Sequence, residues 1–175
     1  MRVPVNGIPA AGITHSIDPQ KEWAAAAAAE ALDGPAETLS GELTLVPASD
    51  RGLVHVSGHL TAGRSATCDR CGESCRREAD VDVQLLYAPE ARDDESFDGG
   101  EIELEVEDLD VGWYAGGALD LASVLGEALA LELPARIRCA DVEECDKRTA
   151  DLLASAGRSG SPAHPAFAAL RDKFA

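Results

Sequence analysis

The sequence predicts an α+β fold in which an antiparallel β-sheet packs against a few helices. Between Ser40 and Val106, segments with apolar residues at every second position follow one another without a helix-length crossover, which favours antiparallel pairing. After Asp120 the apolar residues take the three-to-four-residue period of an amphipathic helix. The length of 175 residues and the hydrophobic content of 45% suit a single α+β domain, which we place at 1–155.

The first expected element is a helix within residues 19–33. Asp18 can cap it, Pro19 suits its first turn, and the Gly-Pro pair at 34–35 ends it. The alanine run at 24–29 has strong helix propensity but offers no large side chain. We therefore expect a lightly packed helix.

Strands are expected after this helix. Residues 43–45 alternate between apolar and polar, and after a turn at 49–52 the alternation resumes over 53–60, which predicts a hairpin. Val81–Tyr87 and Ile102–Val106 alternate in the same way and predict two further half-buried strands. These strands supply most of the expected sheet.

A second helix is expected from Leu121 onward, because apolar residues recur at i, i+3, i+4, i+7 and i+8, and it closes before Pro134. Residues 155–161 have the composition of a flexible linker, and 164–170 form a short apolar segment. We therefore expect residues 156–175 to be a flexible linker followed by a short tail.

The charge balance is strongly acidic. Fifteen Lys and Arg residues against 32 Asp and Glu residues leave a net charge of −17, which repels a polyanion at long range. Any RNA contact must then be local. The acidic stretch 93–110, which lacks basic residues, is interpreted as a solvated sheet face with a mobile loop, the alternative being a site for calcium or a cationic partner. No apolar run is long enough to span a membrane and no secretory signal is evident, so we expect a cytoplasmic protein.

The chain has 5 cysteines. Cys68 and Cys71 form a Cys-x-x-Cys-Gly turn, whose spacing aims both sulfurs at one point while glycine permits a tight backbone. This zinc-knuckle-like turn is typical of half a Zn²⁺ site, and Cys139 with Cys145 can supply the other half. Cys75 is then a spare thiol. Ordinary thiols and redox pairing are the alternatives.

No catalytic arrangement is found in the sequence, which has no nucleophile elbow, no P-loop and no dinucleotide-binding glycine turn. A zinc ion with four protein ligands also leaves no position open for water, which indicates a structural site. A thioredoxin-like redox site would place the Cys-x-x-Cys motif at a helix start, whereas here it lies between expected strands. We therefore predict that the protein is not an enzyme.

Arginines cluster beside both cysteine groups. If a metal joins the groups, these arginines form a local basic patch that can meet phosphates, because exposed charges are screened beyond about 8 to 10 Å. The alternative is pairing with the nearby Asp69, Glu73, Glu78 and Asp141. The candidate arginines are Arg64, Arg70, Arg76, Arg77, Arg136 and Arg138.

Several motifs in one order resemble the YceD family, also called large ribosomal RNA subunit accumulation proteins. They are the Cys-x-Arg-Cys turn at 68–71, the flanking strands, the leucine-rich helix that runs to Pro134, and the Pro165–Leu170 ending. The resemblance covers about 43–170. It implies an α+β fold with a curved antiparallel sheet. It also implies a non-enzymatic factor needed for normal levels or processing of large-subunit ribosomal RNA.

Three functional hypotheses follow. The first is a ribosome-assembly factor that acts as a binding module on large-subunit ribosomal RNA or its precursor particle, with the cysteine-arginine turn and Phe167 of the tail as contacts. The second is a zinc- or thiol-dependent redox or regulatory protein. The third is an adaptor whose acidic strand docks a basic ribosomal protein or another cationic partner without touching RNA.

Overall fold

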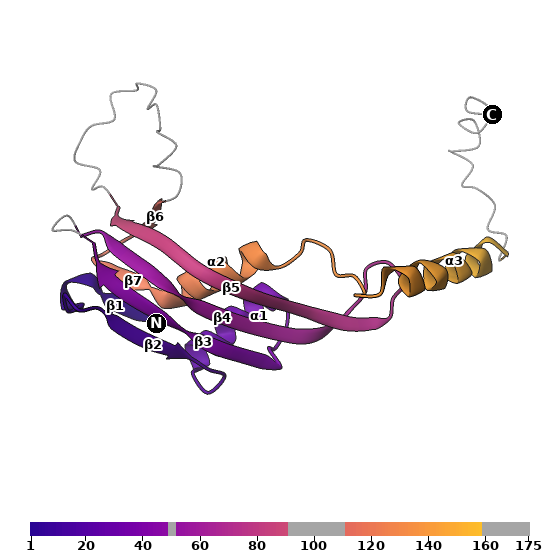
Figure 1. The fold of residues 1–175 in the computed structure, drawn as a ribbon, viewed down its shortest axis with the longest axis horizontal. Coiled ribbons are helices and arrows are strands. Elements are labelled where there is room, and N and C mark those ends of the chain that lie inside the picture. Colours follow the sequence, from indigo (N-terminus) through magenta and orange to yellow (C-terminus); the bar gives the residue numbers. More distant parts are fainter. Residues whose placement is uncertain (49–51, 91–110, 159–175) are drawn as a thin grey trace, which may run out of the picture. The chain divides into compact units, whose positions relative to one another are not determined.

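Alternating apolar residues build the sheet of an α+β fold, as the sequence predicts (Figure 1). The structure, a computed structural model, describes residues 1–48, 52–90 and 111–158. The elements are β1 (Arg2–Pro4), the 3-10 helix η1 (Val5–Gly7), β2 (Ile13–Ile17), α1 (Glu22–Leu32), β3 (Thr38–Pro47), β4 (Val54–Thr67), β5 (Ser74–Pro89), β6 (Val111–Tyr114), β7 (Ala118–Asp120), α2 (Leu121–Glu132) and α3 (Val142–Arg158).

The described chain divides into two compact units. Unit 1 consists of Met1–Ser65 with Arg76–Ala135, and unit 2 consists of Ala66–Cys75 with Arg136–Ala175. The single domain expected over residues 1–155 stays a prediction. Helix α3 continues to Arg158, beyond the point at which the linker was expected to begin.

The main sheet has the strand order β2-β3-β4-β5-β6. The expected hairpin is present as β3 and β4, which pair antiparallel with Leu45 opposite Val56. Gly41 of β3 has φ +148°, and a Cβ there would lie 2.2 Å from the His59 carbonyl oxygen, so only glycine allows this close approach. The antiparallel expectation holds for most of the sheet.

Strand β6 departs from that expectation, because it pairs parallel to β5 with Leu86 opposite Val111. A parallel neighbour requires the chain to return to the same end of the sheet, and the residues between Pro89 and Val111 are numerous enough for that return. The strand expected at Ile102–Val106 lies outside the described residues. Strands β1, β2, β6 and β7 were not predicted from the sequence, because they are short or weakly patterned.

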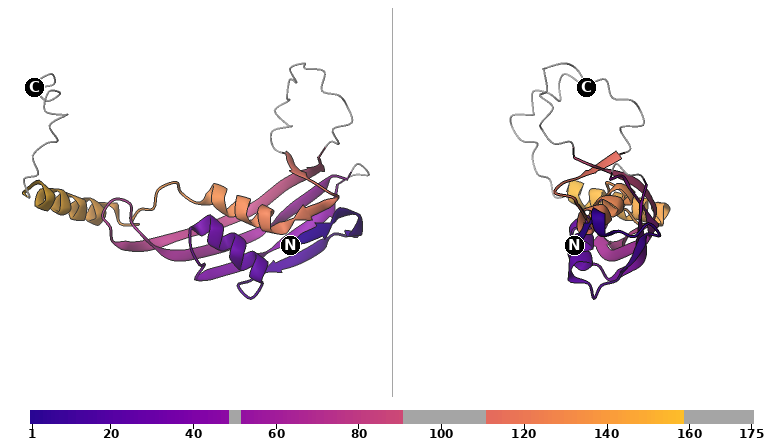
Figure 2. Two further views of the ribbon diagram at one scale, coloured as in Figure 1. Left: turned by 180° about the vertical axis from the view of Figure 1, so that it is seen from behind. Right: turned by 90° about the vertical axis from the view of Figure 1, so that its left-hand side faces the viewer.

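Helices α1 and α2 cover one face of the main sheet, as the view from behind shows (Figure 2). The predicted apolar face of α2 is buried, namely Leu121, Val124, Leu125, Ala128 and Leu129. The buried residues of α1 are mostly alanines. On α2, a Cβ atom added to Gly126 would lie 3.9 Å from the Ala27 carbonyl oxygen of α1. Small side chains therefore let the two helices pack closely.

Helix α1 begins at Glu22 and not at Pro19. Asp18 caps a turn ahead of the helix, since its Oδ1 accepts a hydrogen bond from the Gln20 backbone at 3.0 Å. Its carbonyl accepts from the Lys21 N–H at 3.2 Å, which makes Lys21 the residue that precedes the helix.

Among the described residues, no helix has the length and apolar character that a membrane span requires.

Candidate metal centre

The turn between β4 and β5 carries the first two cysteines of unit 2. The Cys68 N–H donates to the Glu73 carbonyl at 2.8 Å, and the Gly72 N–H donates to the Cys68 carbonyl at 3.0 Å. Gly72 has φ +79°, a left-handed conformation that glycine adopts without strain. The turn buries the side chains of Cys68 and Cys71.

The segment 136–141 and the start of α3 carry the other two cysteines. Two hydrogen bonds hold this segment against the turn. The Asp69 N–H donates to the Ile137 carbonyl at 2.8 Å, and the Asp69 Oδ2 accepts from the Ile137 N–H at 2.7 Å. Asp141 Oδ1 then accepts from the Glu144 N–H at 2.9 Å and starts α3. Cys139 and Cys145 are thereby brought to the first pair.

The four sulfur atoms of Cys68, Cys71, Cys139 and Cys145 lie within 4.8 Å of one another. The Sγ atoms of Cys68 and Cys145 are 3.7 Å apart, and those of Cys71 and Cys139 are 3.5 Å apart. A disulfide would need about 2.05 Å, and all of these cysteines are free. A tetrahedral ion with metal–sulfur bonds of about 2.3 Å has sulfur–sulfur edges near 3.8 Å. The observed spacings fit such an ion.

Backbone donors favour thiolates on the first cysteine pair. N–H groups of Cys71 and Arg70 lower the pKa of the Cys68 thiol to about 6, and the N–H of Glu73 lowers the pKa of Cys71. The neighbouring sulfur of Cys71 raises the pKa of Cys139 to about 12. Without a metal, negative charge therefore gathers on Cys68 and Cys71, where the backbone is arranged to hold it.

Arg148 is a residue of this centre that was not predicted from the sequence. Its Nη2 lies 3.4 Å from the Cys139 Sγ, and its Nη1 lies 3.1 Å from the Glu144 carboxylate. Its contacts with the sulfurs of Cys71 and Cys139 raise its pKa. A guanidinium at this position offsets the negative charge of a four-thiolate site. The spacing in the sequence could have indicated this residue, because Arg148 follows Cys145 by three positions and therefore lies on the same face of a helix.

Cys75, the fifth cysteine, is partly buried and packs against the four-cysteine cluster. Burial, followed by the charges of Cys68 and Cys71, raises the pKa of its thiol. It is not one of the four cysteines whose sulfurs converge. Cys75 therefore stands beside the centre as a neutral thiol.

Four of the six candidate arginines are engaged within their own unit. Arg64 and Arg77 both donate to the Leu32 carbonyl at the end of α1, at 3.3 and 3.1 Å. Arg76 pairs with Glu37 at 2.5 Å and lies 3.6 Å from the Glu78 carboxylate, while Arg70 pairs with Asp146. The expected alternative of local pairing thus applies to Arg70 and Arg76, and apart from Glu78 the partners differ from those expected.

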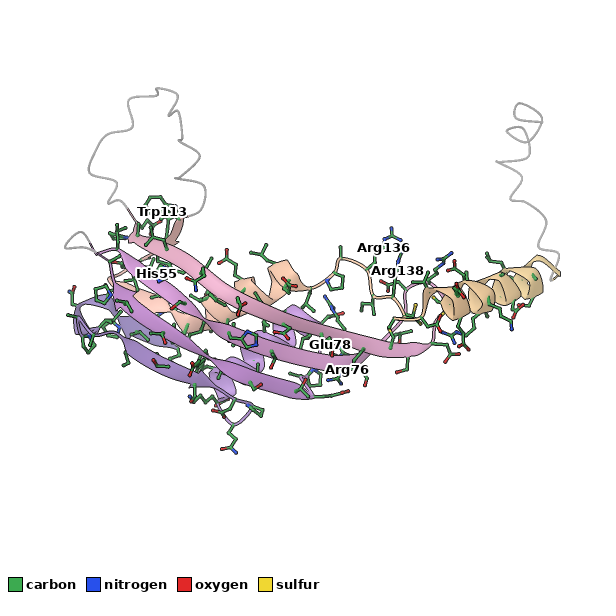
Figure 3. The ribbon with its side chains drawn as sticks, in the orientation of Figure 1. His55, Arg76, Glu78, Trp113, Arg136 and Arg138 are labelled. Atoms are coloured by element: carbon green, nitrogen blue, oxygen red, sulfur yellow. The ribbon has the colours of Figure 1, made fainter. Side chains whose placement is uncertain are left out.

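Arg136 and Arg138 are different, because both are exposed and neither makes a hydrogen bond or ion pair with any residue that the structure describes. They flank Ile137, the residue that Asp69 holds by two hydrogen bonds. Both arginine side chains are labelled in Figure 3. Phe167, the candidate contact in the tail, lies outside the described residues. The guanidinium groups of Arg136 and Arg138, which have no partner among the described residues, therefore lie on the same segment as Cys139.

We expect Arg77→Ala to destabilise unit 1 by about 1 to 2 kcal/mol, because the substitution removes a charged donor from a carbonyl at a helix C-terminus. Urea unfolding followed by circular dichroism measures this loss. Arg2→Ala is the control, since the Arg2 side chain is 81% exposed. Equal midpoints for the two variants would contradict the role of Arg77 at the end of α1.

Residues 56–172 match the family described as large ribosomal RNA subunit accumulation protein YceD. No curated protein and no solved structure matched the chain. The matched range contains all four converging cysteines together with Arg136, Arg138 and Arg148.

Proposed function

The chain belongs to the YceD family of large ribosomal RNA subunit accumulation proteins, and we propose that it supports ribosome assembly as a non-catalytic binding module. The observation that carries this proposal is the family match over the segment that holds the cysteine centre. A cytoplasmic location and association with the large-subunit RNA or its precursor particle are parts of the same proposal.

The four cysteines bind a structural Zn²⁺ ion in this proposal. Four thiolates at tetrahedral spacing are the donor set that zinc takes in closed structural sites, although iron also accepts it. A site closed by Cys68, Cys71, Cys139 and Cys145 leaves no position for a substrate or a water molecule. This supports a binding role over the zinc- or thiol-dependent redox alternative.

The bound ion would hold the 136–141 segment against the cysteine turn and present Arg136 and Arg138 to RNA phosphates. Both guanidinium groups are exposed and free of described partners, whereas Arg64, Arg70, Arg76 and Arg77 are engaged. The net charge of −17 opposes RNA over long distances. Screening beyond about 8 to 10 Å leaves a local contact possible.

Reversing both charges in Arg136→Glu/Arg138→Glu is expected to weaken co-sedimentation with large-subunit precursor particles about tenfold or more, because two phosphate contacts become repulsive. Raising the salt concentration should have the same effect on the unmodified protein. Quantitative immunoblotting of gradient fractions at several salt concentrations measures both effects.

The charge-matched control is Asn6→Glu/Gln84→Glu/Lys147→Glu, which changes the net charge by the same amount at other exposed positions. It should co-sediment nearly as well as the unmodified protein. If both variants lose binding to the same extent, the contact is not local to Arg136 and Arg138. If the unmodified protein is absent from every ribosomal fraction, even at low salt and after cross-linking, the assembly role itself is wrong.

A further inference from the structure

Two cavities adjoin along the solvent side of α2 in unit 1. The first, of about 650 Å³, lies between α1 and α2. The second, of about 690 Å³, lies between α2, strand β6 of the main sheet and strand β7, which pairs with β1 in a separate two-stranded sheet. Ser123 and Glu127 of α2 line both cavities. We call the two adjoining cavities together the α2 furrow, with Trp23 in the first and Trp113 in the second.

The first cavity of the α2 furrow is lined mainly by small side chains. In the first cavity Ala26 and Ala130 are exposed, and Gly126 is partly exposed between them. Such residues leave room for the side chains of another chain without offering it hydrogen-bond donors. A fully polar ligand does not suit such an apolar surface, because its polar groups would lose water without gaining hydrogen bonds.

The charges that line the furrow are mainly negative. Glu30 is exposed and its carboxylate has no hydrogen bond or ion pair within the part of the chain that the structure describes. Glu127 is also exposed, and its contact is with the Tyr87 hydroxyl, a neutral group. Asp120 and Arg2 at the far end offset each other, since Asp120 holds the N-terminal amine at 3.1 Å and Arg2 at 4.0 Å.

Aromatic rings close the second cavity. Trp113 is 61% exposed and stands on β6, the edge strand of the sheet (Figure 3). The Tyr87 ring packs on Gly112, where a Cβ would lie 2.4 Å from its Cε1 atom. An exposed indole in the same cavity as the exposed Glu127 carboxylate attracts a lysine or arginine side chain through both its ring face and the nearby charge.

We propose that the α2 furrow binds a lysine- and arginine-containing protein segment with apolar residues between its charges. The apolar side chains of the segment pack on the small residues of the first cavity. Its lysine and arginine side chains pair with Glu30 and Glu127, and one of them stacks on the Trp113 ring. RNA does not suit this surface, because its phosphates would meet the exposed carboxylates of Glu30 and Glu127. The inference rests on the proposed function and adds a protein contact, in unit 1, to the RNA contact of unit 2.

The first test is the affinity for a fluorescent peptide of about twelve residues in which lysine and arginine alternate with alanine and leucine, compared with a peptide carrying glutamine at the basic positions. Glu30→Lys/Glu127→Lys is expected to weaken binding of the basic peptide about tenfold or more. The matched control is Glu22→Lys/Glu132→Lys, which places the same charge change on exposed positions of the same two helices outside the furrow. The control should lose less than about threefold.

Trp113→Ala is an independent variant that should not affect folding, because its side chain is exposed, and it should also weaken binding of the basic peptide. Melting temperatures of all variants show that each is folded. Equal losses in the furrow and control variants, or equal affinities for the basic and the glutamine peptides, would overturn the inference.

The second test places a photo-reactive residue at Ser123, which is exposed and lines both cavities. The protein is irradiated on large-subunit precursor particles. A protease-sensitive product that maps to a basic segment and disappears with excess basic peptide supports the inference. An RNase-sensitive product, or no product from particles that still carry the protein, overturns it while leaving the proposed function intact. Failure of the unmodified protein to join the particles instead counts against the proposed function.

Discussion

Cys145→Ser is expected to abolish metal binding, reducing the metal content from about one Zn²⁺ per chain to less than about a tenth, and to unfold unit 2. Cys145 joins α3 to the cysteine turn, and structural zinc sites contribute about 10 to 16 kcal/mol of apparent binding free energy to folding. Elemental analysis measures the metal, and loss of helical circular dichroism reports the loss of α3.

The control for this substitution is Cys75→Ser, which removes a thiol that packs against the cluster but is not one of the four converging sulfurs. It should keep the metal and the helical signal. If purified protein holds no zinc even after refolding with zinc, the cysteines are ordinary thiols. A Cys75→Ser variant that also loses the metal would show that the four-sulfur assignment is wrong.

Acid should release the same metal. Backbone donors lower the pKa of Cys68 to about 6, so its thiolate is available at neutral pH and is lost when the pH falls below that range. Protons then compete with the ion for the sulfurs, and metal affinity decreases as the pH decreases. A zinc-sensitive dye records the release during an acid titration.

The second large effect is expected from Leu125→Asp. The Leu125 side chain is completely buried on the face of α2 that packs against α1 and the sheet. An unpaired carboxylate there costs several kcal/mol, a large part of the roughly 5 to 15 kcal/mol that stabilises a domain. We expect the variant to unfold or become insoluble.

Leu131→Asp is the matched control, because Leu131 lies on the same helix with 78% of its surface exposed. It should leave the melting temperature nearly unchanged. Thermal unfolding followed by circular dichroism compares the two. If Leu125→Asp melted at the same temperature as the unmodified protein, this face of α2 would not be part of the core.

Local patterns in the sequence were sufficient to predict those helices and strands in which buried residues recur at a regular spacing. The hairpin of β3 and β4 and the buried face of α2 follow from periodicity, because a strand or helix with one apolar face has one favourable way to bury it. The start of α3 was equally accessible, since Asp141 and Glu144 form a helix-capping pattern, although no helix was predicted there. The Cys68-x-x-Cys71 spacing likewise indicated half of a metal site, because two sulfurs on one tight turn point to one ion.

Sequence alone therefore predicted the fold class, the family resemblance and Cys68, Cys71, Cys139 and Cys145 as candidate metal ligands, while their convergence is seen only in the structure. Only the tertiary structure decided which arginines have partners among the described residues, because Arg64 and Arg77 contact the end of α1, which is far from them in the chain. It also decided that β6 lies parallel to β5 and that Arg148 faces the sulfurs. Such arrangements depend on how whole elements pack, which the pattern of any one segment does not specify.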